Sequence, residues 1–207
     1  EYFNQLLDTG IRDNILKTHQ IDTAKKIILF PARITNWKGQ LEFIDIIKKI
    51  DTQNILVLFA GDTKNESYTK LVRDKINQNN LDGIFKILGS INQGEMRCLY
   101  QLADLSLSLP LRAEGFGRTV SESLYSKTPV LAFDYGGVKN QLANLNDMFK
   151  VKPQDYQVLP KKIEKLLSLS EDQKKEAIEG VQSVIESNFS KINMVNQYLK
   201  LYESLKS

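Results

Sequence analysis

The hydrophobic residues of this chain fall into short apolar runs, and amphipathic segments separate each run from the next. The runs are rich in Ile, Leu, Val and Phe and are too short for buried helices, which indicates β-strands with two buried faces. Five clear runs lie at 27–30, 54–62, 83–89, 105–111 and 129–134, and a weaker sixth lies at 148–153.

The segments between these runs have the spacing of amphipathic helices. In one of them Leu41, Ile44, Ile47 and Ile50 recur so that they share one face of a helix. Helices are therefore expected at 38–50, 67–80, 93–103, 118–127 and 157–169, and the tail is expected to be helical over 170–190 and 191–207.

This alternation of buried strands and helices predicts an α/β fold with a doubly wound parallel sheet of six strands in a Rossmann-like arrangement. We divide the chain into an N-terminal helix and linker at 1–24, the Rossmann-like domain at 25–170, and C-terminal helices of the same domain at 171–207. Ligands of such sheets bind at the carboxyl ends of the strands, so functional residues are expected in the segments that follow the strands.

Composition narrows the classes of function. The chain has 207 residues, 42% of them hydrophobic, and its formal net charge of +3 does not indicate a nucleic-acid partner. The single cysteine, Cys98, and the single histidine, His19, exclude an internal disulfide and a metal site built from several Cys or His ligands. The single cysteine indicates a reducing compartment, so we expect a cytoplasmic location. No apolar run reaches the roughly 18–20 residues of a membrane span, and no signal peptide is visible in the given sequence.

The segment PARITNWKG follows the first predicted strand and contains two cations, Arg33 and Lys38. A guanidinium and an ammonium at this place can clamp a diphosphate, although the spacing by itself fits two solvated cations in a polar loop better. Gly89, Ser90 and Ile91 follow the third strand, where the glycine either lets a flat ring approach the backbone or simply turns the chain.

The segment EGFGRTVSE combines a glycine-rich turn with two acids. Gly115 and Gly117 permit tight backbone geometry before a helix, and free N–H groups at a helix start bind phosphate. Glu122 lies about one turn into this helix and leans back toward its start, so it is expected to accept hydrogen bonds from ribose hydroxyls. Glu114 is suited to a sugar's hydroxyls or to positive charge at the anomeric carbon. A loop acid and a solvated helix acid are the alternatives.

Smaller features carry less weight. Gly136 and Gly137, after the fifth strand, either shape the pocket or form an ordinary loop. Cys98 is expected to pack in the core and His19 to lie on the surface, while Trp37 is expected either over the Arg33–Lys38 loop or in the core.

Together these segments resemble the C-terminal, donor-binding half of a GT-B glycosyltransferase of the large retaining family called family 4 or group 1. PARITNWKG resembles its Gly-Arg-Leu…Lys-Gly motif, and EGFGRTVSESLYSKTPVLAFDYGG resembles its motif of two glutamates separated by seven residues. The resemblance covers roughly residues 20–207. Ala32, where the family usually has glycine, and Asn140, where a glutamate often follows the paired glycines, are departures.

The resemblance implies a nucleotide-diphosphate sugar, UDP- or GDP-linked, as the donor. Arg33 and Lys38 would hold the diphosphate and Glu122 the ribose, while Glu114 would bind the transferred sugar as the catalytic residue. The phosphates would lie on the amides of a run of five residues, Gly115, Phe116, Gly117, Arg118 and Thr119, and the base would face Gly89, Ser90 and Ile91. No metal or other cofactor is expected, in agreement with the lack of an Asp-x-Asp motif.

The resemblance also implies a second domain that this chain does not contain, an N-terminal GT-B domain with the acceptor site. We expect this chain to be a donor-binding half that transfers little sugar alone, from a bacterial enzyme of cell-envelope or lipopolysaccharide synthesis with a glycan or lipid-linked acceptor. Peripheral association of the full protein with the inner face of the cytoplasmic membrane stays open. The alternatives are a non-catalytic partner subunit that binds nucleotide sugars, or an epimerase or phosphorylase of the same fold.

Overall fold

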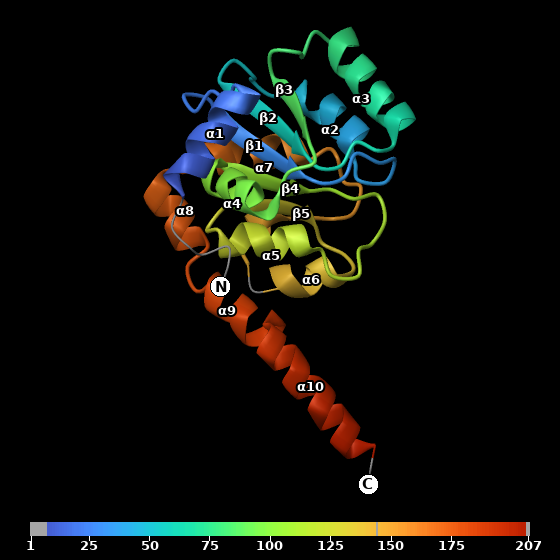
Figure 1. The fold of residues 1–207 in the computed structure, drawn as a ribbon, viewed down its shortest axis with the longest axis vertical. Helices are drawn as coiled ribbons and strands as arrows, with labels where there is room; N and C mark the ends of the chain where they lie inside the picture. Colours follow the sequence, from blue (N-terminus) through green and yellow to red (C-terminus); the bar gives the residue numbers. More distant parts are fainter. Residues whose placement is uncertain (1–7, 144, 206–207) are drawn as a thin grey trace.

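The computed structural model describes residues 8–143 and 145–205 and confirms the predicted α/β architecture (Figure 1). Six strands form one sheet, and every neighbouring pair of strands is parallel. They are β1 (Lys26–Pro31), β2 (Ile55–Ala60), β3 (Phe85–Gly89), β4 (Leu105–Ser108), β5 (Val130–Phe133) and β6 (Lys150–Val151). Their order is β3-β2-β1-β4-β5-β6, so the direction of winding reverses between β1 and β4, where a ligand crevice is expected.

Helices cover both faces of this sheet. They are α1 (Thr9–His19), α2 (Gln40–Ile47), α3 (Glu66–Gln78), α4 (Gln93–Leu102), α5 (Arg118–Tyr125), α6 (Gly137–Leu142), α7 (Leu159–Leu167), α8 (Glu171–Ala177), α9 (Val181–Phe189) and α10 (Lys191–Ser204). Of the segment predicted at 1–24, residues 1–7 lie outside the described residues, and α1 packs on α4 through the buried Ile15.

Alternate residues of the central strands point to opposite cores, as expected for a parallel sheet covered on both faces. In β1, Ile27 and Leu29 join the core formed with α1 and α4, whereas Ile28 and Phe30 join the larger core that includes α2 and α3. Phe30 is also in register with Phe59 of β2, and their rings meet edge to face. The buried double-faced strands therefore explain the continuous apolar runs.

Three features differ from the sequence-based prediction. The segment 170–190 forms two helices, α8 and α9, because Gly180 takes a left-handed conformation with φ +73° between them. The segment after β5, where no helix was predicted, contains the short helix α6. The weak sixth strand is only two residues long.

Cys98 is buried in the core, as predicted, and burial raises the pKa of its thiol to about 11.

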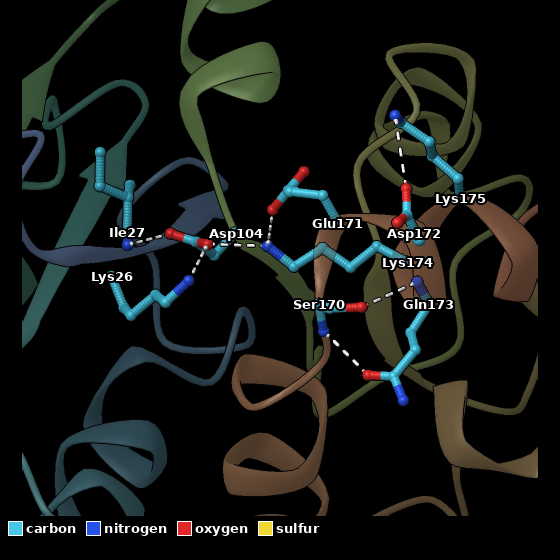
Figure 2. A network of polar contacts seen from close by, with 9 residues as sticks. All are labelled: Lys26, Ile27, Asp104, Ser170, Glu171, Asp172, Gln173, Lys174 and Lys175. Atoms are coloured by element: carbon cyan, nitrogen blue, oxygen red, sulfur yellow. Dashed lines mark hydrogen bonds and ion pairs between the residues drawn. The ribbon is translucent and has the colours of Figure 1, made fainter.

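A polar network joins α8 to the sheet at the edge opposite the strands' carboxyl ends (Figure 2). Asp104 accepts hydrogen bonds from the Lys174 ammonium at 2.8 Å, the Ile27 N–H at 2.9 Å and the Lys26 ammonium at 2.9 Å. Burial opposes ionisation of this carboxyl, but these three donors outweigh it and lower its pKa. Lys174 also pairs with Glu171 at 2.8 Å, so a nearly buried lysine fixes the start of the C-terminal helices.

The last helix, α10, extends away from the sheet (Figure 1). It has no buried residue, although it carries several large apolar side chains that are more than 40% exposed, among them Ile192, Val195, Leu199 and Tyr202. Within the described part of the chain, no helix combines the length and the apolar character needed to cross a bilayer.

Candidate functional site

A cavity of about 590 Å³ opens at the carboxyl ends of the central strands. Its walls come from the loop after β1, the glycine-rich turn before α5, and the inner sides of α4 and α5. It brings together the two predicted cations, both predicted glutamates and the whole predicted turn, namely Arg33, Lys38, Glu114, Gly115, Phe116, Gly117, Arg118, Thr119 and Glu122. Segments separated by some 80 positions thus converge where the winding of the sheet reverses.

The loop after β1 is held tightly against its neighbours. The N–H of Ile34 donates to the carbonyl of Asp62 at 2.9 Å, and the N–H of Leu111 donates to the carbonyl of Trp37 at 2.8 Å. Gly39 has φ +88°, and a Cβ there would lie 2.2 Å from the carbonyl oxygen of Leu109, so only glycine fits at this crossing. The start of α2 therefore lies directly against the end of β4.

Lys38 and Glu114 form an ion pair across the cavity. Their side chains are only 14% and 13% exposed, so the two charges compensate each other in a place that is largely shielded from water. The Lys38 ammonium also lies 4.3 Å from the centre of the Trp37 ring, which places this tryptophan over the loop rather than in the core. Arg33 is exposed at the mouth of the cavity.

The turn before α5 is built to present backbone amides. Gly117 caps α5 with φ +77°, and in the described part of the chain the N–H groups of Gly115 to Thr119 have no hydrogen-bond acceptor. These donors, together with the helix dipole, make the turn suited to an anion. The ring of Phe116 packs against Phe189 of α9, with ring centres 5.5 Å apart.

Glu122 lies in α5 and faces the same cavity. Its carboxylate accepts a hydrogen bond from the hydroxyl of Tyr100 at 3.1 Å. Burial raises the pKa of Glu122, although the Tyr100 hydrogen bond and the positive charge of Arg118 oppose the shift. Burial, and secondarily the Glu122 charge, also raises the pKa of Tyr100 well above its ordinary value. The tyrosine is therefore a neutral donor that orients the carboxylate.

The paired glycines after β5 form the back wall of the turn. The N–H of Gly137 donates to the carbonyl of Glu114 at 2.9 Å. A Cβ on Gly137 would lie 2.1 Å from the Gly115 carbonyl oxygen, and one on Gly136 would lie 2.5 Å from that of Glu114. The glycines are thus required for the close approach of α6 to the turn, although neither of them lines the cavity.

Gly89, Ser90 and Ile91 do not line this cavity. Gly89 ends β3 and Ser90 and Ile91 follow it. The carbonyl of Gly89 accepts a hydrogen bond from the N–H of Gly61 at 2.9 Å. Ser90 instead lines a separate polar hollow beside α3.

Among the cavity residues that were not singled out from the sequence are Met96 and Tyr100 of α4. Both belong to an apolar helical pattern that predicts core packing, and only the hydroxyl of Tyr100 indicated a different role. Among the described residues, there is no group of three or more His, Cys, Asp or Glu side chains that could hold a metal ion.

Comparison with known proteins places this chain in a family. The sequence profile described as glycosyl transferases group 1 matches residues 11–182. Trehalose synthase of Thermococcus litoralis is 28% identical over 202 residues, a match that covers 92% of this chain and 48% of that protein. This chain therefore spans about half the length of that curated relative.

Solved structures agree with the sequence match. A glycosyltransferase from Rickettsia africae covers 100% of this chain with 55% of its own, at 27% identity and a TM-score of 0.89. The Anabaena protein HepE, solved with UDP and glucose, covers 98% of this chain with 54% of its own, at 20% identity and a TM-score of 0.82, a likeness of fold. The fold is therefore half of a GT-B fold, and the chain belongs to the glycosyl transferases group 1 family.

Proposed function

We propose that this chain is the C-terminal, donor-binding half of a retaining glycosyltransferase and that its cavity holds a nucleotide-diphosphate sugar. One observation carries the proposal: a single cavity collects two cations, a turn of free backbone amides and two glutamates from segments far apart in the sequence. Cations and amides suit the diphosphate, and carboxylates suit the hydroxyl groups of the ribose and the sugar.

In this proposal each group of residues binds a different part of the donor. Arg33 and Lys38 hold the diphosphate from one side, and the amides of the turn hold it from the other. Glu122, oriented by the Tyr100 hydroxyl, accepts hydrogen bonds from the ribose. Gly89, Ser90 and Ile91 remain the candidates for the base, which would extend out of the cavity toward β3.

Glu114 takes the position next to the transferred sugar. The bond between the anomeric carbon and the phosphate oxygen breaks, and the oxygen of the acceptor hydroxyl bonds to the same face of that carbon. The proton of that hydroxyl passes to the leaving phosphate oxygen. Glu114 stabilises the positive charge that develops on the sugar, while Lys38 and the turn stabilise the negative charge on the leaving diphosphate. Lys38 and Glu114 already form an ion pair, so the arriving diphosphate would compete with Glu114 for the Lys38 ammonium. No bound metal is needed, since cationic side chains and amides supply the compensation.

The name of HepE, solved with UDP and glucose, supports UDP as the first donor base to test, ahead of GDP. The relatives named trehalose synthase support a free sugar as a second candidate acceptor, beside the glycan or lipid-linked acceptor of a bacterial envelope pathway at the inner face of the membrane. A panel of both acceptor classes, given to the full-length enzyme, separates these possibilities.

A second domain completes the site. The apolar residues Ile192, Val195, Leu199 and Tyr202 recur at helical spacing along α10 and are all exposed, which is the pattern of a helix that packs against another surface. The curated relative is also about twice as long as this chain. We assign this face to an N-terminal domain that supplies the acceptor site, so the present chain alone should transfer little or no sugar.

Calorimetry tests the donor site directly. UDP, GDP and ADP are titrated into this chain and into the variants Arg33→Ala and Glu122→Ala, with Lys161→Ala and Glu164→Ala on the exposed side of α7 as charge-matched controls. One nucleotide should bind, and only the first two variants should weaken it, by about tenfold or more each. Equal binding by all variants would contradict the site, and loss of binding in EDTA would contradict the metal-free proposal.

A transfer assay tests the division into halves. This chain, incubated with UDP-glucose, GDP-mannose and both classes of acceptor, should give no transfer above background. Joining it to the preceding domain should restore activity. Robust transfer by the chain alone would refute the assignment of the acceptor site to another domain, and no transfer by the joined protein would favour a non-catalytic binding subunit.

A further inference from the structure

Two buried glutamines lie behind the two walls of the cavity and do not line it. Gln141 of α6 is 2% exposed, and its side-chain amide donates to the carbonyl oxygens of Phe116 and, at 3.4 Å, of Gly117. Gln40 at the start of α2 is 0% exposed, and its amide donates to the carbonyl oxygen of Arg33 at 2.9 Å. Each glutamine therefore contacts the backbone of a segment that lines the proposed donor site.

The orientation of both side chains follows from chemistry. A carbonyl oxygen can only accept a hydrogen bond, so the NH₂ end of each glutamine must face it. The other end has no role in fixing the side chain, because Oε1 of Gln40 and Oε1 of Gln141 have no hydrogen-bond partner among the described residues. The contact between the NH₂ group and the loop carbonyl is thus the polar interaction that defines each position.

The backbone geometry turns this contact into an effect on the cavity. In a trans peptide the C=O and the following N–H point in opposite directions. When Gln141 holds the Phe116 carbonyl on the α6 side, the N–H of Gly117 is directed away from α6. Gly137 packs closely against the backbone of Gly115 and Phe116 on that side, and this contact opposes rotation of the turn toward α6.

Gln40 fixes the other wall in the same way. It binds the carbonyl of the Arg33–Ile34 peptide, while the N–H of that peptide donates to the carbonyl of Asp62 at 2.9 Å. The peptide is held at both ends, so the direction in which the Arg33 side chain leaves the backbone is set. Arg33 is itself exposed and has no buried surroundings to orient it.

We infer that Gln40 and Gln141 are positioning residues for the diphosphate: Gln141 aims the amides of the turn, and Gln40 aims Arg33. The inference rests on the proposed function, since the diphosphate is the ligand that both walls would hold. It adds two residues outside the cavity lining on which donor affinity depends. A purely structural role is the alternative, in which each glutamine only stabilises the packing of its helix.

Methionine variants separate these roles, because methionine keeps the length of the side chain and removes only the amide. We would prepare Gln141→Met and Gln40→Met, with Gln78→Met at the exposed end of α3 as the control. Nuclear magnetic resonance relaxation of the ligand-free chain would report the order parameters of the Gly117 and Ile34 amides, and calorimetry would report UDP and GDP affinity. Thermal melting would report stability.

Each variant should loosen only the loop that its glutamine contacts. Gln141→Met should lower the order parameter of Gly117 from about 0.85 toward 0.6 and leave Ile34 unchanged, and Gln40→Met should do the reverse. Each should weaken nucleotide binding about tenfold, while Gln78→Met changes neither quantity. The melting temperatures of the two variants should fall by only a few degrees. Gln40→Met loses one hydrogen bond and Gln141→Met loses two, but each variant also removes one unpartnered buried oxygen.

Two results would overturn the inference. Rigid Gly117 and Ile34 amides in both variants would show that the glutamines do not hold the loops. Mobile amides with unchanged nucleotide affinity would show that the loops need no such support for binding. If the wild-type chain bound no UDP, GDP or ADP, the proposal that this chain binds a nucleotide donor would be contradicted. The relaxation data would still decide whether the glutamines position the walls of the cavity.

Discussion

The contact between α6 and the glycine turn gives the sharpest quantitative prediction. In Gly137→Ala, the added Cβ would lie 2.1 Å from the carbonyl oxygen of Gly115, 2.6 Å from the Cα of Phe116 and 2.7 Å from the carbonyl carbon of Gly115. All three atoms belong to the backbone, so no side chain can rotate to relieve the clash. Ordinary contact at this Cβ begins near 3.4 Å, so the turn and α6 must separate by more than 1 Å.

Two effects should follow from this displacement. The forced separation of packed segments should lower the free energy of unfolding by about 1–3 kcal/mol. The same shift moves the amides of the turn, and a misplacement of about 1 Å in a binding or catalytic group can cost about 100-fold. We therefore expect nucleotide affinity to fall by between about tenfold and 100-fold, with UDP as the first ligand to measure.

Urea unfolding and calorimetry would measure the two effects on the same preparations. Gly83→Ala is the matched control, because Gly83 lies in an exposed loop and an added Cβ would meet no atom within 4 Å. It should behave as wild type in both assays. If Gly137→Ala also unfolded and bound nucleotide as wild type does, the contact of α6 with the turn would not hold the turn in place.

Three further predictions concern the ionisable groups. Tyr100→Phe removes a hydrogen bond that lowers the pKa of Glu122, so nucleotide binding should be lost at a higher pH on acidification than in wild type, as titrations between about pH 4 and 8 would show. Lys174→Met should lower the free energy of unfolding by about 1–3 kcal/mol at neutral pH. This loss is smaller than for a buried ion pair without other partners, because Asp104 keeps its other donors. The control is Lys175→Met, which should change the free energy of unfolding by less than about 0.5 kcal/mol because the Lys175 side chain is 74% exposed. Since the pKa of Asp104 is lowered and that of Lys174 is raised, the wild-type advantage should persist between their ordinary values of 3.8 and 10.5 and should shrink as the pH leaves that window on either side, as urea unfolding across pH would reveal.

Much of the site could be predicted because its residues follow strands. Arg33 comes after β1, and the turn with its two glutamates comes after β4, so their shared edge of the sheet followed from the alternation of strands and helices alone. Glu122 could be aimed at the cavity because side chains lean toward the start of a helix. The boundary errors lay where local signals were weak, at the short helix α6 and at the break at Gly180.

Other parts of the site depend on contacts between segments that no local pattern connects. The pairing of Lys38 with Glu114, the hydrogen bond from Tyr100 to Glu122 and the place of Gln141 behind the turn all join residues from different elements. A buried glutamine in a short helix looks like any polar residue until the helix is docked.

The sequence by itself therefore determined the class of fold, the family resemblance and the edge of the sheet at which the candidate site lies, because strand length, helical spacing and turn chemistry are local properties of the chain. Only the tertiary structure decided which cation pairs with which acid, that Gly89 to Ile91 lie apart from the cavity, and that Gly137 touches the turn. These features depend on distances of a few ångströms between elements far apart in sequence, and packing of the whole domain sets those distances.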